Sequence, residues 1–221
     1  MNEVAIYVEG GGDTAQQRAE LRNGMDRLLN TQKQAAREKQ LRWKLVPSGG
    51  RQSTYDAFIN AVRQANRETL CVLLVDSEGP ITHETKGKLL VNAQVRKHHL
   101  ETRDSWDLNK IEPETIHLMV QCMEAWILAD PESLANYYGK GFRAKSLPAR
   151  PNLEDEPKLE VYGKFGKVTK NTSKGPYSDA NNAKIKHAGA LLALIDPKKV
   201  AARCPRFATF ITWLDAQINR A

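Results

Sequence analysis

Three short strand-like segments, separated by amphipathic segments of helical length, constrain the fold of this chain more than any other feature. The segments are Glu3–Val8, Leu41–Val46 and Leu70–Val75; the first is apolar and rich in β-branched residues, and the last is the most apolar run in the chain. Between them, residues 15–40 and 52–67 carry apolar side chains at helical spacing, and we expect one helix in each. This alternation predicts an α/β fold with a mostly parallel sheet flanked by helices. The run Leu70–Val75 is apolar throughout, which is typical of a strand covered on both faces.

The rest of the chain is predicted to add one strand and several helices. We expect a strand at Ile116–Met123 and helices at Glu124–Asp130, Pro131–Tyr138, Asn182–Ile195 and Arg206–Ile218. Residues 139–175 are rich in proline and lysine and are expected to be irregular. Asp13 and Asp130 lie beside the starts of predicted helices. We expect Asp13 to be an N-cap or first-turn residue, with a metal ligand as the alternative, and Asp130 to be a turn or N-cap residue.

Carboxylates follow two of the predicted strands. Glu9 ends the first strand, and Asp76 and Glu78 end the third. The carboxyl ends of parallel strands lie at one edge of a sheet, so these side chains converge if the two strands are neighbours. Like charges repel unless a cation neutralises them, and oxygen ligands suit Mg²⁺ or Mn²⁺. The group predicts metal-assisted phosphoryl transfer or phosphodiester hydrolysis, with Gly10–Gly12 admitting a phosphate. Helix-capping or solvated carboxylates are the simpler interpretation.

Two nucleotide-binding motifs compete with this interpretation. Residues 10–15 (GGGDTA) match the G-x-G-x-x-A dinucleotide fingerprint. The second predicted strand, however, ends in Val46-Pro47-Ser48 and not in the acidic residue that would hold a ribose. Glu9 would also lie against a pyrophosphate with no cation between them, so a nicotinamide cofactor is disfavoured. No Gly-Lys-Ser/Thr follows the glycines, which excludes a Walker A loop.

Four stretches together resemble a known family. They are YVEGGGDTAQQR at 7–18, GGRQSTYDAF at 49–58, LLVDSEGP at 73–80 and HLMVQCMEAWILADPESLANYYG at 117–139. They are similar to a family of small bacterial TOPRIM-like proteins related to OLD-type nucleases. The resemblance implies a TOPRIM-like, Rossmann-like fold in which Glu9 is an acid–base residue or metal ligand and Asp76 and Glu78 are the metal-binding pair. Glu78 stands where TOPRIM proteins usually have aspartate. Members are often encoded beside an ATPase of the ABC/SMC type, which implies a two-protein system in phage defence or repair.

Four further residues are candidates for the same site. Glu124 would lie at the edge of the sheet with Glu9 if it opens a helix after a strand. It would then be a fourth metal ligand, or simply an acid favoured by the helix dipole. Arg51 follows Ser48-Gly49-Gly50 after the second strand and is placed to bind a phosphate through its two-pronged guanidinium. Arg18, beside the Glu9 loop, and Lys174, in a glycine-lysine-aromatic cluster, are candidate substrate contacts. For these three cations a plain surface position is the alternative.

The positive charge is concentrated in the last part of the chain. The net charge is +7, yet residues 131–221 contain 16 Lys or Arg and only 8 Asp or Glu. We therefore divide the chain into a TOPRIM-like core, 1–139, and a basic loop and helical extension packed on it, 140–221. Lysines between 140 and 174 alternate with aromatic residues that include Phe165, and Tyr177 follows them. That mixture predicts a groove that holds nucleic-acid phosphates and stacks bases; a solvated basic face is the alternative.

The remaining features concern compartment and function. Three widely spaced cysteines form neither a disulfide framework nor a metal knuckle and are typical of a reducing cytoplasm. Apolar runs are too short to cross a bilayer and no signal peptide is evident, so we expect a cytoplasmic protein with no membrane partner. We expect a Mg²⁺- or Mn²⁺-dependent nuclease, or a related phosphoryl-transfer enzyme, acting on DNA or RNA, with a homo-oligomer left open. The alternatives are a non-catalytic sensor or partner subunit of an ATPase that retains the acidic pocket, and a small-molecule phosphate or nucleotide binder.

Overall fold

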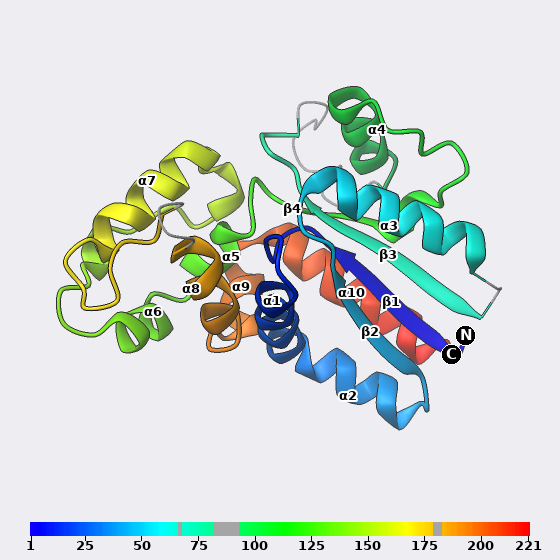
Figure 1. The fold of residues 1–221 in the computed structure, drawn as a ribbon, viewed down its shortest axis with the longest axis horizontal. Coiled ribbons are helices and arrows are strands. Elements are labelled where there is room, and N and C mark those ends of the chain that lie inside the picture. The colour runs from blue at the N-terminus through cyan, green and yellow to red at the C-terminus, as the bar shows by residue number, and fades with distance from the viewer. Residues whose placement is uncertain (66–67, 82–92, 179–182) are drawn as a thin grey trace.

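A four-stranded parallel sheet forms the centre of the molecule. The computed structural model describes residues 1–65, 68–81, 93–178 and 183–221. The strands are β1 (Glu3–Val8), β2 (Arg42–Pro47), β3 (Thr69–Asp76) and β4 (Ile116–Met119). Their order in the sheet is β2-β1-β3-β4, and every neighbouring pair is parallel (Figure 1). The predicted α/β class with a parallel sheet is therefore confirmed, and the arrangement is consistent with a Rossmann-like fold.

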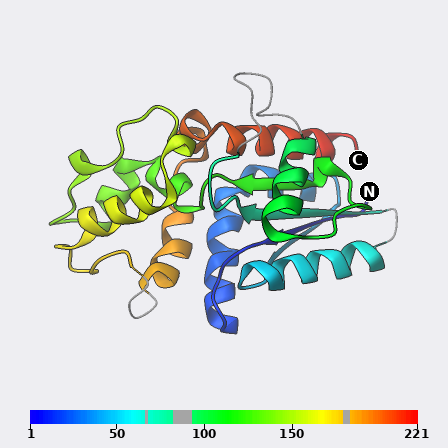
Figure 2. The same ribbon diagram turned by 90° about the horizontal axis from the view of Figure 1, so that it is seen from above.

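Helices cover both faces of the sheet. They are α1 (Ala15–Leu28), α2 (Asn30–Glu38), α3 (Arg51–Gln64), α4 (Ala93–Asp104), α5 (Glu124–Leu128), α6 (Pro131–Tyr138), α7 (Lys158–Thr169), α8 (Ala183–Leu192), α9 (Pro197–Arg203) and α10 (Pro205–Asn219). Helices α1, α2 and α10 pack on one face, and α3 and α4 pack on the other (Figures 1 and 2). Short 3₁₀ turns lie at Pro113–Thr115, Ala144–Ser146 and Leu153–Asp155. Among the described residues, no helix has the length and apolar character needed to cross a membrane.

The apolar strands explain this three-layer arrangement. Successive side chains of a strand point to opposite faces, so a strand that is apolar throughout buries both. In β1, Val4 and Ile6 join the hydrophobic cluster beneath α1 and α10, whereas Ala5 and Tyr7 join the cluster beneath α3. The same division holds along β3, which confirms the predicted burial of Leu70–Val75 on both faces.

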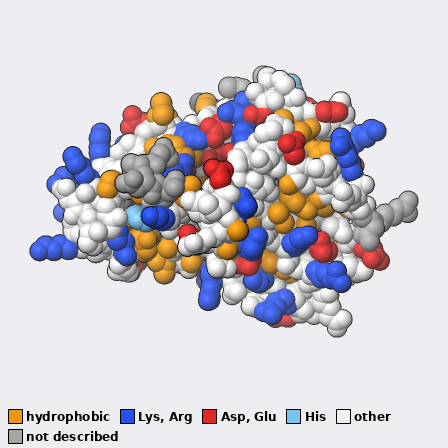
Figure 3. All heavy atoms as spheres, in the orientation of Figure 1, with side chains coloured by type: hydrophobic (Ala, Val, Ile, Leu, Met, Phe, Trp, Pro, Cys, Tyr) orange, Lys and Arg blue, Asp and Glu red, His pale blue; other side chains and the backbone are white. Residues whose placement is uncertain are grey.

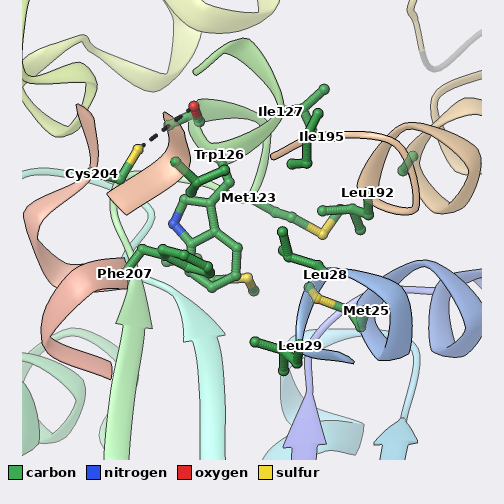
Figure 4. Close-up of a cluster of buried hydrophobic side chains, with 14 of the residues drawn as sticks. Met25, Leu28, Leu29, Met123, Trp126, Ile127, Leu192, Ile195, Cys204 and Phe207 are labelled. Atoms are coloured by element: carbon green, nitrogen blue, oxygen red, sulfur yellow. Dashed lines mark hydrogen bonds between the residues drawn. The ribbon is translucent and has the colours of Figure 1, made fainter. Parts of the chain in front are cut away.

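Residues late in the sequence belong to the main hydrophobic cluster. Trp126 of α5 is fully buried, and its indole meets the Phe207 ring of α10 edge-on at 4.8 Å between centroids. Figure 4 shows side chains of α1, among them Met25 and Leu28, beside Leu192 of α8 in the same cluster. Residues on both sides of position 140 therefore share one core, and α10 covers part of the sheet itself.

Two glycines bring α1 and α8 into close contact. A Cβ atom added at Gly24 would lie 2.3 Å from the carbonyl oxygen of Gly189, and one added at Gly189 would lie 2.5 Å from that of Glu20. No side chain fits at either position without separating the helices. Because α8 carries Lys184 and Ile185 near its start, this contact sets where those two side chains lie relative to the turn before α1.

Several predicted elements differ from those observed. The expected helix over 15–40 is two helices, because Leu29 leaves helical geometry with a ψ of 23°. The expected strand Ile116–Met123 ends at Met119, and α9 had no predicted counterpart. The segment 139–175 is not irregular throughout, since α7 lies within it.

Helix α7 also overturns part of the predicted nucleic-acid groove. Val161, Phe165 and Val168 lie at i, i+4 and i+7, so one face of α7 is apolar and buried. Phe165 is fully buried and stacks on Tyr177, with 4.0 Å between ring centroids. The prediction that these two aromatic rings stack on bases is wrong, because both belong to the core.

Candidate functional site

The turn after β1 holds Glu9 at the carboxyl edge of the sheet. The backbone N–H of Glu9 donates to the carbonyl of Leu74 at 3.0 Å, which continues the β1–β3 ladder by one residue. Gly10, Gly11 and Gly12 follow with φ of 115°, 89° and 62°, a region that favours glycine. Gly10 and Gly49 exchange two backbone hydrogen bonds of 2.8 and 3.0 Å. The turn is thus fixed to the loop before α3.

Helix α1 begins directly after this turn, and Thr14 is its N-cap. The Thr14 hydroxyl accepts from the backbone N–H of Gln17 at 3.2 Å, and the Gln17 side chain accepts from the backbone N–H of Thr14 at 3.2 Å. This capping box satisfies two N–H groups of the first turn. The prediction that Asp13 caps the helix is wrong, because the next residue takes that role. The N-cap prediction for Asp130 is confirmed by its hydrogen bond from Ser133 N.

Glu9 and Asp76 meet at the point where the chain switches between faces of the sheet. β1 is followed by α1 on one face and β3 by α4 on the other, so the crevice outside their carboxyl ends is the expected ligand position. The backbone N–H of Asp76 donates to Glu9 Oε2 at 3.1 Å, and Asp76 Oδ1 accepts from Met123 N at 2.9 Å. The β1–β3 pairing confirms that the carboxylates after these two strands converge.

A pocket of about 350 Å³ opens at this position. Four carboxylates line it, those of Glu9, Asp76, Glu78 and Glu124, together with the turn Gly10–Gly12 and the side chains of Lys158 and Lys184. All four predicted acidic residues therefore reach one pocket. Near the middle of the face seen in Figure 3, acidic side chains lie among basic ones. Four acidic groups in so small a volume require nearby positive charge.

Two lysines supply part of that charge. Lys158, at the start of α7, hydrogen-bonds to Glu78 Oε1 at 2.5 Å, and its Nζ lies 3.7 Å from Asp76 Oδ2. Lys184, in α8, lies 3.4 Å from Glu124 Oε1. Sequence reasoning missed both residues. Lys158 directly follows Pro157 and opens the overlooked helix α7, so a search for amphipathic spacing between 158 and 169 would have placed it at a helix start.

Arg51 neutralises Glu9 from the other side of the pocket. Its Nη1 donates to Glu9 Oε2 at 3.0 Å and to the carbonyl of Asp76 at 2.6 Å. Its Nε and Nη2 form a two-pronged ion pair with Asp104 at 2.8 and 2.6 Å. The guanidinium also lies over the Trp106 ring at 5.1 Å. Arg51 lies beside Glu9, as predicted. Its donors, however, orient Glu9 and join β3 to α4, so they do not face an open phosphate position.

Burial raises the pKa of both central carboxylates. The pKa of Asp76 lies well above its usual range, first because the carboxyl is buried and then because Glu124 and Glu9 are close. The pKa of Glu9 is raised by burial and lowered, to a smaller extent, by Arg51. The positive charges of Lys158, Lys184 and Arg51 therefore do not fully offset burial and the repulsion between carboxylates. Proton uptake by Glu9 and Asp76 is favoured as a result.

Glu124 is held by side chains from the second half of the chain. It begins α5 and is only 1% exposed. The Tyr177 hydroxyl donates to Glu124 Oε1 at 2.9 Å, and the Tyr177 ring is fixed by its stack on Phe165. Burial, and then the charge of Glu124, raises the pKa of the Tyr177 hydroxyl. Residues after 140 thus complete the acidic pocket as well as packing on the core.

Two predicted substrate contacts are not brought to the pocket. Arg18 donates from Nη1 to the backbone carbonyl of Asp13 at 3.0 Å and does not line the cavity. Lys174 lies over the Tyr137 ring, with its Nζ 4.5 Å from the ring centroid, and is also absent from the lining. Both residues were predicted because they lie close in sequence to glycine-containing turns. Nearness in sequence does not fix the direction of a long side chain.

The four carboxylates of the pocket are chemically suited to a hard divalent cation. Carboxylates are the ligands that Mg²⁺ and Mn²⁺ prefer, and the pocket holds four of them. In the part of the chain that the structure describes, however, no group of three or more His, Cys, Asp or Glu is spaced to coordinate a metal ion. Lys158 lies between Asp76 and Glu78, so a cation would take over the charge that this lysine provides.

The fold and pocket together define a three-layer α/β protein with an acidic, lysine-bridged pocket at the switch point of a parallel sheet. The chain belongs to the family described as "Domain of unknown function (DUF4276)", whose model matches residues 8–215. A search of curated proteins and a search of solved structures each gave no significant match.

Proposed function

We propose that this protein is a divalent-metal-dependent nuclease, or a related phosphoryl-transfer enzyme, that acts on nucleic acid. The observation that carries the proposal is the convergence of four carboxylates beside a glycine turn at the sheet's switch point. This arrangement agrees with the resemblance of the sequence to TOPRIM-like proteins, in which such carboxylates hold Mg²⁺. A metal ion bound there would neutralise phosphate charge and lower the pKa of a bound water.

The residues of the pocket have distinct roles in this proposal. Glu9, Asp76, Glu78 and Glu124 would hold Mg²⁺ or Mn²⁺. Arg51 orients Glu9 through its bond to Oε2, and Met123 N orients Asp76 through Oδ1. Once a metal satisfies the carboxylates, the ammonium groups of Lys158 and Lys184 become available to bind a phosphodiester. Burial is the main cause of the raised pKa of Asp76 and of Glu9, and for Asp76 the nearby charges of Glu124 and Glu9 add to it. A bound cation would favour the ionised form of both groups, which is consistent with this arrangement.

A groove beside the pocket offers a path for the nucleic-acid strand. It has a volume of about 600 Å³ and lies between α7 and the segment 176–178. Lys167 and Lys170 line it, and Lys184 lines both the groove and the acidic pocket. Lys164 is less suited to contact phosphate, since it pairs with Glu156 at 3.3 Å. These lysines support the proposal that the strand runs along this groove.

Cleavage assays with matched variants test the enzymatic proposal. Single-stranded DNA, duplex DNA and RNA are each incubated with the protein and Mg²⁺, Mn²⁺ or chelator. We expect metal-dependent cleavage that the double variant Asp76→Asn/Glu78→Gln abolishes, while the exposed control Glu160→Gln retains it. Calorimetry should show Mn²⁺ binding that is lost in the double variant alone. Mn²⁺ binding unchanged in that variant, or no cleavage of any of the three substrates, would contradict the proposal.

The ion network supports one alternative, a non-catalytic subunit that keeps the acidic pocket. Arg51 and Lys158 already pair with three of the four carboxylates, which is how a purely structural cluster would be neutralised. Such a protein would act as a sensor or partner of an ATPase of the ABC/SMC type. Failure of cleavage together with stable co-purification with an ATPase encoded beside it would favour this alternative.

Binding measurements test the strand path separately from catalysis. In the variant Lys167→Gln/Lys170→Gln, we expect the dependence of log affinity on log salt for nucleic acid to flatten by roughly two units, one per lost phosphate contact. The control Lys39→Gln/Lys110→Gln removes the same charge from distant exposed positions and should leave the slope unchanged. Equal slopes for both double variants would exclude this groove as the path.

A further inference from the structure

A second cavity lies at the open edge of the sheet, next to β4. Its volume is about 440 Å³, and residues of α4, the turn Pro113–Thr115, β4 and α10 line it. Arg96, Glu114 and His117 line it, together with Trp213 and several small side chains of α10. It shares no lining residue with the acidic pocket. A cavity of this size is in the range that small organic ligands occupy.

His117 presents an unsatisfied hydrogen-bond acceptor in this region. Its side chain is 2% exposed, and its ring lies 4.9 Å from that of Phe210 and 4.5 Å from that of Trp213. The imidazole hydrogen-bonds to the backbone of Glu114, whereas its Nε2 is buried and has no partner among the described residues. Burial lowers the pKa of His117 well below the usual value, so the ring is neutral. The bond to Glu114 therefore uses the Nδ1 proton and leaves Nε2 as an acceptor without a donor.

Arg96 presents the opposite deficiency, a buried cation with no ion-pair partner. The residue is 6% exposed, and its Nε donates to the carbonyl of Ile116 at 2.5 Å, at the edge of β4. Burial lowers the pKa of Arg96 to about 10, so the guanidinium keeps its charge at neutral pH. Glu114 lines the same cavity and its charge partly offsets the effect of burial on the pKa of Arg96, but no ion pair joins a carboxylate to Arg96 in the described part of the chain. Buried charges in proteins are usually paired, which makes an anionic ligand the natural complement of this one.

We propose that this cavity binds a small aromatic acid. Its carboxylate pairs with Arg96, its flat apolar body packs against Trp213, and an O–H or N–H on its ring donates to Nε2 of His117. Each feature of the ligand matches one feature of the cavity: a buried cation without an ion pair, an aromatic wall and an acceptor without a donor. The cavity is a different site from the acidic pocket, so the proposal stands independently of the nuclease function.

Binding of hydroxybenzoates to the intact protein tests the proposal. The probes are 3-hydroxybenzoate and 4-hydroxybenzoate, with benzoate as the analogue without a donor and benzyl alcohol as the analogue without a carboxylate. Titration is followed by NMR through the indole N–H of Trp213 and the ¹⁵N resonance of His117 Nε2. We expect a Kd on the order of 1 mM or lower for at least one hydroxybenzoate, with weaker binding of both analogues. The Nε2 resonance should move only with the hydroxylated probes.

Three variants locate the site. Arg96→Met should weaken hydroxybenzoate binding about tenfold or more, whereas Arg63→Met, at an exposed position on α3, should not change it. His117→Phe should bind benzoate as before and lose the preference for the hydroxylated probe. Because Arg96 also bonds to β4, thermal unfolding checks that Arg96→Met is folded. If that variant does not fold, the test is whether the hydroxylated probes shift the His117 Nε2 resonance of the unaltered protein. Absence of any Trp213 or His117 shift at millimolar probe, or equal binding to a folded Arg96→Met variant, overturns the proposal.

Discussion

The close contact between α1 and α8 can be tested by a single methyl group. A Cβ at Gly24 would lie 2.3 Å from the Gly189 carbonyl oxygen, whereas ordinary contacts of a Cβ begin near 3.4 Å. The helices must therefore separate by roughly 1 Å to accept Gly24→Ala. Overpacking of this kind typically destabilises a protein by about 1–3 kcal/mol.

The sign of the effect distinguishes packing from helix propensity. Gly24 lies inside α1, and replacing glycine by alanine in a helix interior otherwise stabilises by about 1 kcal/mol. The matched control is Gly163→Ala in α7, where an added Cβ meets nothing within 4 Å, and a gain of about 0.5–1 kcal/mol is expected there. For a chain of this length, a loss of 1–3 kcal/mol lowers Tm by about 2–12 °C.

Urea unfolding and thermal melts of both variants measure the difference. We expect Gly24→Ala to fall below the parent protein and Gly163→Ala to rise above it. Because Lys184 is carried by α8, Gly24→Ala should also weaken the proposed Mn²⁺ binding more than Gly163→Ala does. A Gly24→Ala protein as stable as the Gly163→Ala protein would refute the packing argument.

Three further predictions concern charge and the core. The raised pKa of Asp76 means that the folded protein keeps this proton at a pH where the unfolded chain has lost it. The contribution of Asp76 therefore makes the free energy of unfolding fall as the pH rises from the usual aspartate range toward neutrality. Asp76→Asn should lack this contribution, and urea unfolding of both proteins at pH 5 and pH 8 measures the difference. Lys158→Met should destabilise the metal-free protein by about 1–3 kcal/mol, because it leaves Asp76 and Glu78 without that cation. Mn²⁺ should restore part of this loss. In the same thermal melts, the exposed control Lys198→Met should leave the stability unchanged. Trp126→Ala should destabilise by about 3–5 kcal/mol, since it empties the centre of the shared core, and an effect below 1 kcal/mol in urea would be inconsistent with the packing described.

The sheet and the acidic residues were predictable because both follow from local patterns. β1 was predicted with its observed bounds, since Glu3–Val8 is short, apolar and ended by three glycines. Glu9 and Asp76 could be placed at one edge because the direction of parallel strands fixes where their carboxyl ends lie. Neither inference needed a contact between distant parts of the chain.

The cations of the pocket were not predictable in the same way. Lys158 reaches Glu78 across 80 positions of sequence. Its place at the start of an amphipathic helix is the one local signal that distinguishes it from the other lysines of this segment, and that signal does not say which carboxylate it contacts. The two glycines of α7, Gly163 and Gly166, weakened its helical signal, although Val161, Phe165 and Val168 carry the buried face. Arg18 and Lys174 failed as candidates for a related reason, because the direction of a long side chain depends on neighbours such as Asp13 and Tyr137.

Helix α10 has a consequence for how the chain is made. It follows every strand in sequence, yet its Phe207 and Phe210 are buried in the same cluster as Met119 of β4. Synthesis runs from the N-terminus, so the strands emerge from the ribosome before the helix that covers this face. The nascent chain therefore exposes an apolar surface until α10 emerges, which makes this surface a natural contact for chaperones and the place where shortened chains would aggregate.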